Sequence, residues 1–477
     1  MAKLLFLQNI EYEFLGPMYI SAHAKDGGHE VRISLGDNAN DFEPTILEFQ
    51  PDLLGFSTMT GSHLWARNIA HQLKVRHGLL NIFGGAHPTF FPEFIRESGV
   101  DMLVRGEGEE TVREILDCID AGRDFSDLAN LTLKFPDGSV RENPVRMLRR
   151  DLDDYPFPDR HLYDALKGRI DRRVRNVITS RGCPFHCTFC FEDSMRELYR
   201  GKGKYVRIRA IAKVIEELKI QRSTTDVHTI YFADDVFGLN RKWLYEFLDV
   251  YKREVGLPFI CLVRADLVAA DPEYAQRLAD GGCKTVFFGI ESGNEEIRNR
   301  VLKKKLTNVQ IRLAAERLHT AGIKFRTYNI VGLPDETLED AFVTMRLNID
   351  IRADYPWCSV FMPFPGTALT DYAFDRGYLD RSFKFDSLSE SFFIDSKLNM
   401  PDIDRIANLQ KFFQTAVLWP RTLPIVSRLI NLRPNRLFDA WFGMVYFLVY
   451  IRSENKSFWK TLRFAVYNYH HVLSGKR

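Results

Sequence analysis

Three cysteines stand within eight residues of one another, at Cys183, Cys187 and Cys190, in the segment RGCPFHCTFC that spans 181–190. Three thiolates in one tight loop can hold three irons of a cubane cluster and leave the fourth iron open to a ligand that the protein does not supply. A structural zinc site would need His186 or a distant cysteine as its fourth ligand, and such sites usually show two separated ligand pairs. Inert thiols are a third interpretation. The spacing favours a [4Fe–4S] cluster.

The rest of the composition describes a folded chain in a reducing compartment. Its 477 residues are 45% hydrophobic and 27% charged, with a formal net charge of +2, which gives no reason to expect nucleic acid as a partner. The four other cysteines, at 118, 261, 283 and 358, are isolated and form no disulfide framework. The amino-terminal MAKLLFLQNIEYEF reads as a buried first strand and not as a signal peptide. We therefore expect a cytoplasmic protein.

An alternating pattern over residues 1–145 predicts a parallel sheet with helices between its strands. Short apolar runs at 4–7, 31–35, 53–58, 81–83 and 102–104 alternate with amphipathic stretches, and a β-hairpin at 131–143 follows. This is the pattern of a doubly wound, Rossmann-like domain, whose ligands bind outside the carboxyl ends of the strands. The candidate residues at those ends are Ser57, Thr58, Gly84, Gly85, His87 and Glu107.

A second α/β region is predicted at 173–370, after a proline-bearing linker at 146–172. Its apolar runs at 176–179, 229–233, 259–263, 285–290, 324–331 and 359–362 are spaced for six βα units, which favours a partial (β/α)6 barrel. The three cysteines follow the first of these strands directly. They are thus expected at the carboxyl end of the barrel, where barrel enzymes carry out their chemistry.

Residues 371–477 are predicted to form a helical region rich in aromatic side chains. The twelve-residue uncharged run AWFGMVYFLVYI at 440–451 is shorter than the roughly 20 residues that span a bilayer. Arginines and lysines flank it. One interpretation is a buried helix that closes the barrel, and the other is an interfacial helix that contacts a membrane or an apolar substrate.

The segment CPFHCTFC resembles the CxxxCxxC signature of the radical S-adenosylmethionine (SAM) enzymes, including the aromatic Phe189 before the last cysteine. In that family SAM chelates the open iron. One electron, from a donor such as flavodoxin or ferredoxin, then cleaves SAM to a 5′-deoxyadenosyl radical. The resemblance implies that Cys183, Cys187 and Cys190 hold the cluster of an enzyme that attacks an unreactive C–H bond.

Four segments downstream resemble SAM-contacting segments of the family and follow in the same order. GIESG at 289–293 is similar to the segment at the ribose and methionine moieties, and NIVGLP at 329–334 to the one near adenine. LVRAD ends the third strand with an arginine placed for the methionine carboxylate, and YFADD at 231–235 resembles the acidic motif whose second aspartate faces the cavity. The implied cofactor contacts are Asp235, Arg264, Gly289, Glu291, Ser292 and Asn329.

Each of these segments also has a purely structural interpretation. GIESG could be a strand-to-turn transition, Asp234 and Asp235 could cap a helix, and Arg264 could pair with Asp266. Their order after the cysteine motif is what favours the cofactor-binding interpretation.

The first domain resembles the cobalamin-binding domain that precedes the radical domain in one subclass of the family. Small residues at 57, 58, 84 and 85 would let the backbone approach a bulky cofactor. The Asp-x-His-x-x-Gly motif that supplies a cobalt ligand in methionine-synthase-type domains is absent, and Gly28-His29-Glu30 does not fit it. His87 is the histidine that could approach cobalt, and a local hydrogen bond is its alternative role.

With both cofactors, the resemblance implies methylation of an unactivated carbon or phosphorus centre. A cyclisation, ring contraction or oxidation of a hydrophobic substrate without methyl transfer is the alternative. A non-catalytic iron–sulfur sensor or scaffold is the second alternative. The aromatic carboxyl-terminal region suggests a small-molecule substrate of the lipid, isoprenoid or tetrapyrrole class and a peripheral membrane contact.

Overall fold

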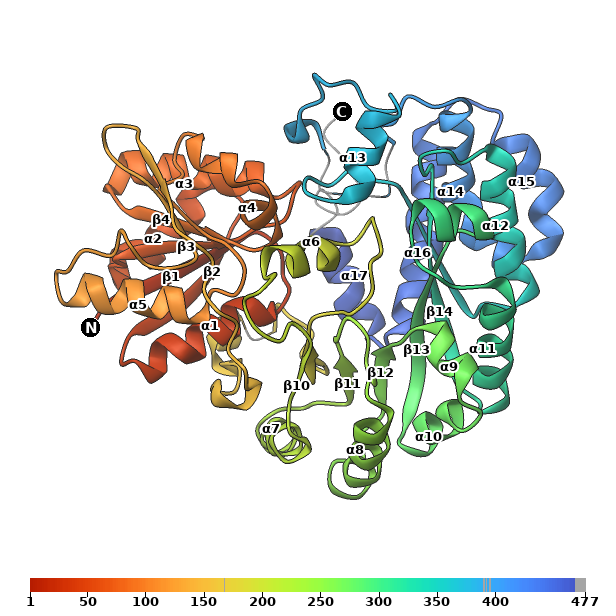
Figure 1. The fold of residues 1–477 in the computed structure, drawn as a ribbon, viewed down its shortest axis with the longest axis horizontal. Coiled ribbons are helices and arrows are strands. Elements are labelled where there is room, and N and C mark those ends of the chain that lie inside the picture. The colour runs from red at the N-terminus through yellow and green to blue at the C-terminus, as the bar shows by residue number, and fades with distance from the viewer. Residues whose placement is uncertain (167, 389–390, 392, 394–395, 468–477) are drawn as a thin grey trace.

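The computed structural model describes residues 1–477 except 167, 389–390, 392, 394–395 and 468–477. Two α/β units lie side by side, with the amino-terminal unit at the left of Figure 1 and the second unit at its centre and right. Helices from the last hundred residues pack against the second unit. The doubly wound domain, partial barrel and helical region predicted from the sequence are all present.

The first unit is a seven-stranded sheet in the order β2-β1-β3-β4-β5-β6-β7. Its first five strands are parallel and its last two form the predicted hairpin. The helices pack on both faces: α1 and α5 contribute to one buried apolar cluster, and α2 and α3 to the other. The chain order reverses between β1 and β3, which is where such sheets open a ligand crevice. The elements are β1 Lys3–Gln8, α1 Leu15–Asp26, β2 Glu30–Leu35, α2 Ala39–Phe49, β3 Leu53–Ser57, α3 His63–His77, β4 Leu80–Gly84, α4 Ala86–Phe90, β5 Met102–Val104, α5 Glu109–Asp120, β6 Leu131–Lys134 and β7 Val140–Glu142.

The segment predicted as a linker packs onto this first unit. It contains short 3-10 turns at Leu152–Asp154 and Arg160–Leu166. Tyr163 is fully buried, its hydroxyl donates to Gln8 Oε1 at 3.0 Å, and it accepts from the Phe14 amide at 3.2 Å. The connection between the two units is therefore fixed by the core of the first.

The second unit is a six-stranded, all-parallel sheet in the order β15-β14-β13-β12-β11-β8, with α7 to α12 on its outer face. The edge strands β8 and β15 do not pair with each other, so the barrel is open. The strand predicted at 359–362 begins earlier, at Tyr355, and contains Pro356. An edge strand tolerates proline because one side of its backbone needs no ladder partner. The elements are β8 Val174–Val177, β9 Ser180–Arg181, α6 Phe191–Leu198, β10 Arg207–Ile208, α7 Ile211–Thr224, β11 Thr229–Phe232, α8 Arg241–Glu254, β12 Phe259–Leu262, α9 Ala265–Ala270, α10 Tyr274–Asp280, β13 Cys283–Glu291, α11 Asn308–Thr320, β14 Lys324–Val331, α12 Leu338–Asp350 and β15 Tyr355–Val360.

The carboxyl-terminal helices are α13 Ala368–Asp375, α14 Ile403–Leu418, α15 Leu423–Leu429, α16 Arg436–Ser453 and α17 Phe458–Tyr467. Of these, α14 and α16 pack on the free edge of β15. From α14, the amides of Gln410 and Gln414 donate to the carbonyls of Cys358 and Pro356, each at 2.9 Å. These side chains supply the hydrogen bonds that another strand would make, and the edge is blocked against further pairing.

An arginine inside the open barrel ties α16 to the sheet. The Arg326 guanidinium donates to Glu454 Oε1 at 3.1 Å, and its carbon lies 4.2 Å and 4.7 Å from the ring centroids of Phe287 and Trp357. The Arg326 side chain is 2% exposed and that of Glu454 is 14% exposed. Such a buried pair is costly to break because the remaining charge has little water to solvate it.

The Arg326→Met substitution should lower the free energy of unfolding by about 3 kcal/mol, because Glu454 keeps its charge but loses this partner. The matched control is Arg346→Met, which breaks an exposed ion pair with Glu339 and should cost less than about 1 kcal/mol. Urea denaturation of the three proteins measures both values. Equal losses in the free energy of unfolding of Arg326→Met and Arg346→Met would contradict the conclusion that Arg326 ties α16 to the sheet.

Candidate active site

The cysteine loop connects β9 to α6 at the carboxyl end of the barrel sheet. Cys190 is the residue before the first turn of α6, and its amide donates to the Cys187 carbonyl at 3.1 Å. All three thiols are free and half-buried. Burial raises the pKa of Cys183 to about 11 and that of Cys190 to about 12. These thiols therefore need a metal to replace their protons, as expected of ligands that ionise on binding.

Thr188, in the middle of the loop, anchors it to distant parts of the barrel. Its amide donates to the Leu302 carbonyl at 3.1 Å and its hydroxyl to the Val301 carbonyl at 2.7 Å, while its carbonyl accepts from the Leu369 amide at 2.9 Å. The loop is thus held between the turn after β13 and the start of α13. Its shape is set by the fold and not by its own residues alone.

His186, the fourth ligand in the zinc interpretation, is occupied elsewhere. It is exposed, and its Nδ1 lies 3.1 Å from Asp193 Oδ1 on α6. Within the described residues, no three histidine, cysteine, aspartate or glutamate side chains, the three cysteines included, are placed to hold a single metal ion; the choice between zinc and a cluster therefore rests on the kind and spacing of the donors. The donor set of three cysteine sulfurs without a histidine is the one that suits an iron–sulfur cluster with an open iron.

The end of β13 forms a buried charged pair beside the loop. Glu291, which has a left-handed φ of 65°, accepts from Lys304 Nζ at 2.6 Å. A Cβ on Gly289 would lie 1.9 Å from the Glu291 carboxylate and would displace the pair of Glu291 and Lys304. Lys304 Nζ also lies 5.8 Å from the ring centroid of Phe189, and the fully buried Ser292 accepts from the backbone of the following turn. These predicted residues cluster next to the cysteines, and their contacts to SAM stay predictions.

Arg264 lies beside the cysteine loop, and its donors are engaged within the protein. It pairs with Asp266 at 3.0 Å and donates to the Lys304 carbonyl at 2.9 Å. Its guanidinium carbon is 3.6 Å from the ring centroid of Phe185, between the first two cysteines of the motif. The alternative ion pair considered from the sequence is thus formed. In this structure Arg264 supports the loop, and the expected pairing with a methionine carboxylate stays a prediction.

The side chain of Asn329 makes its contacts inside the sheet, and the place of this segment near adenine stays a prediction. The Asn329 amide group donates to the Trp357 carbonyl at 2.8 Å and accepts from Asn348 Nδ2 at 2.8 Å, and the residue is 1% exposed. The side chain is therefore saturated inside the sheet and has no group left for adenine. The physical reason is that Asn329 points to the helix side of β14, where α12 supplies Asn348 as its partner.

The two aspartates after β11 have different environments. Asp234 accepts from the backbone and hydroxyl of Thr179 and from the Ser180 hydroxyl, so it fixes the strand that leads into the cysteine loop. Asp235 lines the large cavity described below, as predicted. Burial, followed by repulsion from Glu192 and Asp234, raises the pKa of Asp235 to about 7.

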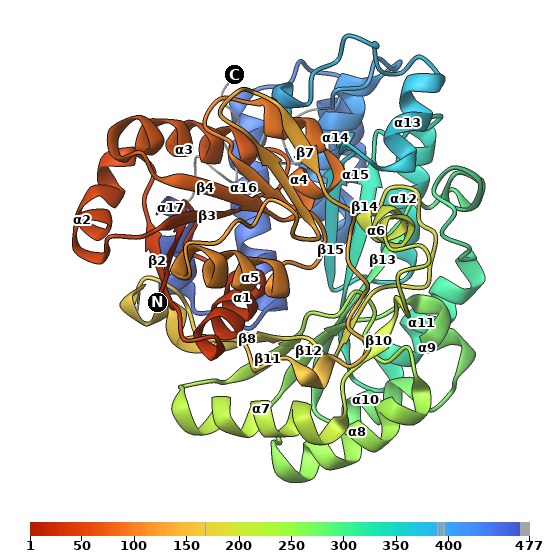
Figure 2. The ribbon, with the colours of Figure 1, turned by 60° about the vertical axis from the view of Figure 1, so that its left-hand side comes forward.

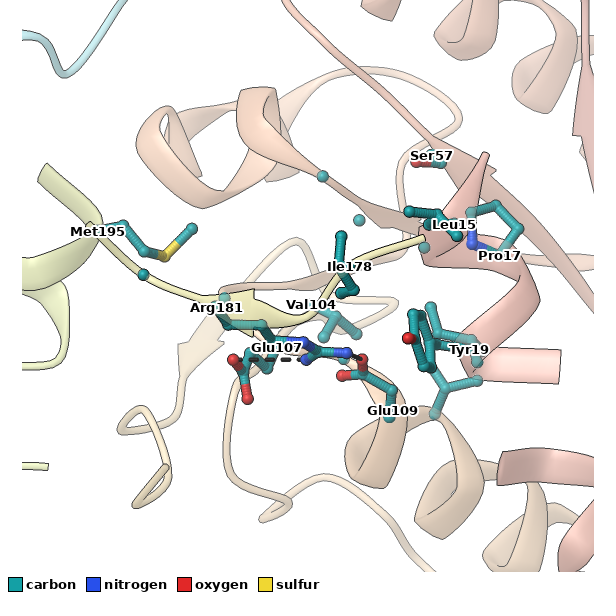
Figure 3. Close-up of a pocket in the computed structure, with 18 of the residues that line it drawn as sticks. Leu15, Pro17, Tyr19, Ser57, Val104, Glu107, Glu109, Ile178, Arg181 and Met195 are labelled. Atoms are coloured by element: carbon teal, nitrogen blue, oxygen red, sulfur yellow. Dashed lines mark hydrogen bonds and ion pairs between the residues drawn. The ribbon is translucent and has the colours of Figure 1, made fainter. Parts of the chain in front are cut away.

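A long cleft crosses the carboxyl ends of the first sheet and reaches the cysteine loop. It consists of two cavities of about 410 and 290 Å³, which share Phe6, Phe56, Ser57 and Gly85 in their walls. The larger one, drawn in Figure 3, runs from β1 and β5 to Gly182, directly before the first cysteine. The smaller one lies at the point where the strand order reverses. One continuous cleft is therefore lined by both α/β units.

The small residues predicted for cofactor binding stand at the floor of this cleft. Ser57 lines both cavities, Thr58 the smaller one and Gly84 the larger one. Gly85 has a φ of 101°, and a Cβ there would lie 2.6 Å from the Thr58 carbonyl oxygen. A Cβ on Gly84 would meet no atom within 4 Å. The backbone at Gly84 is thus open to a ligand, and Gly85 makes the turn that presents it.

His87 makes the local hydrogen bond that was predicted as its alternative role. Its Nδ1 lies 2.9 Å from Thr60 Oγ1, its ring stacks on His63 with centroids 3.9 Å apart, and Phe94 packs against its edge. It is 1% exposed and lines neither cavity. Burial lowers its pKa to about 3. The ring faces the core because aromatic packing holds it there, and it does not reach a ligand in the cleft.

A buried ionic network joins the two units at the mouth of the larger cavity. Arg181 donates to Glu109 at 2.7 Å and lies 3.4 Å from Glu107, as Figure 3 shows. Arg207 donates to the other oxygen of Glu107 at 3.1 Å. Burial opposes the charge on Arg181, but the carboxylates of Glu109 and Glu107 raise its pKa overall. Glu107 was predicted to contact a cofactor, and here it holds the cysteine-loop stem.

Sequence reasoning missed Arg181 and Arg207. The available signal was their position: Arg181 stands two residues before Cys183, and the acidic GEGEE segment at 106–110 follows a predicted strand of the first domain. Pairing the two would have predicted that the first domain docks on the cysteine loop.

Comparisons with known proteins agree with this arrangement. The radical SAM superfamily profile matches residues 177–347, and the B12 binding domain profile matches residues 11–116. An uncharacterised methyltransferase of Pyrococcus horikoshii is 32% identical over 373 residues, which are 76% of this chain and 79% of that protein. The anaerobic magnesium-protoporphyrin IX monomethyl ester cyclase of Rubrivivax gelatinosus is 26% identical over 412 residues, 83% of this chain and 72% of the cyclase.

The fold is also that of a solved structure. The radical SAM methyltransferase TsrM from Kitasatospora setae, determined with tryptophan and a SAM analogue, superimposes with a TM-score of 0.69. It is 16% identical, and the match covers 95% of this chain and all of TsrM. The chain belongs to the radical SAM superfamily, in the subclass that carries a B12-binding domain. It is an enzyme whose cofactors are a [4Fe–4S] cluster, SAM and cobalamin.

The Arg181→Met substitution should lower the free energy of unfolding by about 3 kcal/mol, because Glu109 stays buried without its partner. The fraction of cobalamin that stays bound during gel filtration should also fall, because the ion pair between the first unit and the stem of the cysteine loop is lost. Arg200→Met, which removes an exposed arginine on the same side of the loop, is the control. If Arg200→Met lowered the free energy of unfolding and the retention of cobalamin as much as Arg181→Met does, the ion pairs of Arg181 would not be what joins the two units.

Glu336, directly after the NIVGLP segment, gives a pH-dependent prediction. Burial raises its pKa to about 8, while the amides of Gly332 and Leu333 donate to its carboxyl group. Because the pKa of Glu336 is higher in the folded than in the unfolded protein, its protonated carboxyl group favours the folded state most at pH values below the ordinary carboxyl pKa. That contribution to stability is lost as the pH rises through about 8. Glu336→Gln should remove this fall, which is roughly 2 kcal/mol or more.

The measurement is the free energy of unfolding of wild type and Glu336→Gln from pH 5 to about pH 9. Glu339→Gln, at an exposed position on α12, is the matched control and should follow the wild-type curve. Parallel curves for wild type and Glu336→Gln would show that the carboxyl group is ionised in the folded protein at all of these pH values.

Proposed function

We propose that this enzyme methylates an unactivated carbon or phosphorus centre of a small molecule, using the radical made at the cysteine loop and a methyl group carried by cobalamin. The observation that carries this proposal is the shared cleft. Its walls include Ser57, Gly84 and Gly85 of the first unit together with Gly182 and Asp235 of the second. A ligand on the first sheet would therefore lie next to whatever binds at the cluster.

The residues in the cleft fit cobalamin in a form without a histidine ligand. The backbone at Gly84 is open, and the walls are mostly apolar, with contributions from Phe6, Phe56 and Val104. Among the described residues, no histidine lines either cavity. A flat corrinoid with its nucleotide tail suits a cleft that follows the ends of several strands.

When bound, the cluster and SAM supply a 5′-deoxyadenosyl radical, and cobalamin supplies the methyl group. The chain's own residues determine where these groups meet. Thr188 fixes the cysteine loop against the barrel, and Arg181 fixes its stem against Glu109 of the first unit. The raised pKa of Asp235 leaves this carboxyl group of the cavity wall only partly ionised at neutral pH. The mostly apolar walls leave few polar groups beside the reacting centres to take part in side reactions.

The relatives support methyl transfer and also name the second candidate. The Pyrococcus relative and TsrM are described as methyltransferases, whereas the Rubrivivax relative is described as a cyclase of a magnesium porphyrin. A radical cyclisation on a tetrapyrrole is therefore the alternative that we retain. In either case the substrate class that we propose is a hydrophobic small molecule, with flavodoxin or ferredoxin as the electron donor.

The deciding experiment is isotopic. The reconstituted holoenzyme is incubated with SAM labelled with deuterium in its methyl group, a reductant and a small-molecule extract of the producing cells. Methyl transfer predicts 5′-deoxyadenosine, S-adenosylhomocysteine and a product that is heavier by the labelled methyl group. Mass spectrometry detects all three.

Cys187→Ala is the control, and it should abolish 5′-deoxyadenosine while cobalamin uptake persists, because the loop and the cleft floor come from different units. Formation of 5′-deoxyadenosine with no labelled product would favour the cyclisation. The absence of 5′-deoxyadenosine from the wild-type reaction would leave a non-catalytic role as the remaining interpretation.

A further inference from the structure

The helix α16 is apolar on two neighbouring faces. Its inner face, with Phe442, Val445 and Val449, is buried against the barrel. A second stripe, hereafter the outer stripe, consists of Leu437, Trp441, Met444 and Leu448, and each of its members is exposed, with Leu437 79% exposed. The spacing of four, three and four residues places the four side chains on one side of the helix. A helix at a protein surface ordinarily presents polar residues there.

The outer stripe is large and is flanked by arginines. Arg433 and Arg436 precede it and Arg452 follows it, and all three are exposed. Among the described residues none of the three has an acidic partner. Over 419–467 the chain has eight lysines and arginines and two acidic residues, although its overall charge is only +2. Both acids are committed elsewhere, Asp439 to Lys411 and Glu454 to Arg326 and Lys456.

The neighbouring segments add exposed aromatic side chains. Trp419 precedes α15, and Phe458 and Trp459 begin α17, where Trp459 is 75% exposed. Phe458 packs edge-on against Phe447 of α16, with centroids 5.6 Å apart. Exposed tryptophan beside arginine is the composition of helices that lie at a membrane–water interface, where the ring spans the apolar and the hydrated layers.

We infer that the outer stripe of α16 docks on an anionic phospholipid bilayer, with the helix lying in the plane of the surface. The apolar side chains would enter the acyl boundary and the arginines would contact lipid phosphates. None of the described helices is long and apolar enough to span a bilayer. A second copy of this chain fits less well, because a symmetric contact would bring two unneutralised arginine clusters together.

The test is cosedimentation of the reconstituted full-length enzyme with two kinds of vesicle, phosphatidylcholine alone and phosphatidylcholine mixed with phosphatidylglycerol. We expect binding to the mixed vesicles and little to the neutral ones. The double substitution Met444→Glu and Leu448→Glu should reduce the bound fraction about tenfold. Val309→Glu, at an exposed apolar position on α11 outside the stripe, is the control and should bind like wild type.

Circular dichroism melting checks that the variants fold, and light scattering measures their mass in solution. No binding to mixed vesicles, or binding that the stripe variant leaves intact, would overturn the inference. A wild-type dimer that the stripe variant converts to a monomer would show instead that the stripe is a self-interface. These readouts involve no substrate turnover, so their outcome is independent of the proposed methyl transfer.

Discussion

The placement of Arg181 between Glu107 and Glu109 is the constraint on which the geometry of this enzyme depends. The arginine lies on the stem of the cysteine loop and the carboxylates lie at the end of β5, in the other unit. Removing either side of this pair by substitution would leave a mostly buried charge without a partner, which costs several kcal/mol. The ion pairs of Arg181 with Glu107 and Glu109 therefore hold the cysteine loop in one position relative to the floor of the cleft.

Much of the architecture follows from local patterns. The apolar runs locate the strands because parallel strands are buried on both faces, and the cysteine spacing locates the loop that carries the cluster. Strand β15 was displaced in the prediction because Pro356 argues against a strand, and only its position at the sheet edge, covered by Gln410 and Gln414, makes proline acceptable. Whether a strand lies at the edge of a sheet depends on the tertiary structure and cannot be predicted from a short stretch of sequence.

The site was predictable in outline and less so in its contacts. Glu291 and Asp235 stand where the motif order placed them. The sequence did not settle the orientation of His87 and Asn329, because a residue at a strand end can turn toward the core or toward the cleft. That choice depends on partners such as His63 and Asn348 from other elements. The apolar pattern also did not predict the outer stripe of α16. It shows that the helix is apolar but not which side chains are buried against the barrel and which are exposed.

The anchoring of Thr188 bears on the order of maturation. Its partners Val301 and Leu369 lie 113 and 181 residues further along the chain, so the loop cannot take its described shape until most of the barrel has been synthesised and has collapsed. Contacts of such long sequence separation form late, because their loop-closure entropy is compensated only by the finished fold. Iron insertion into a preshaped loop is thus a post-folding event, and a nascent chain presents three neighbouring cysteines without a scaffold to organise them.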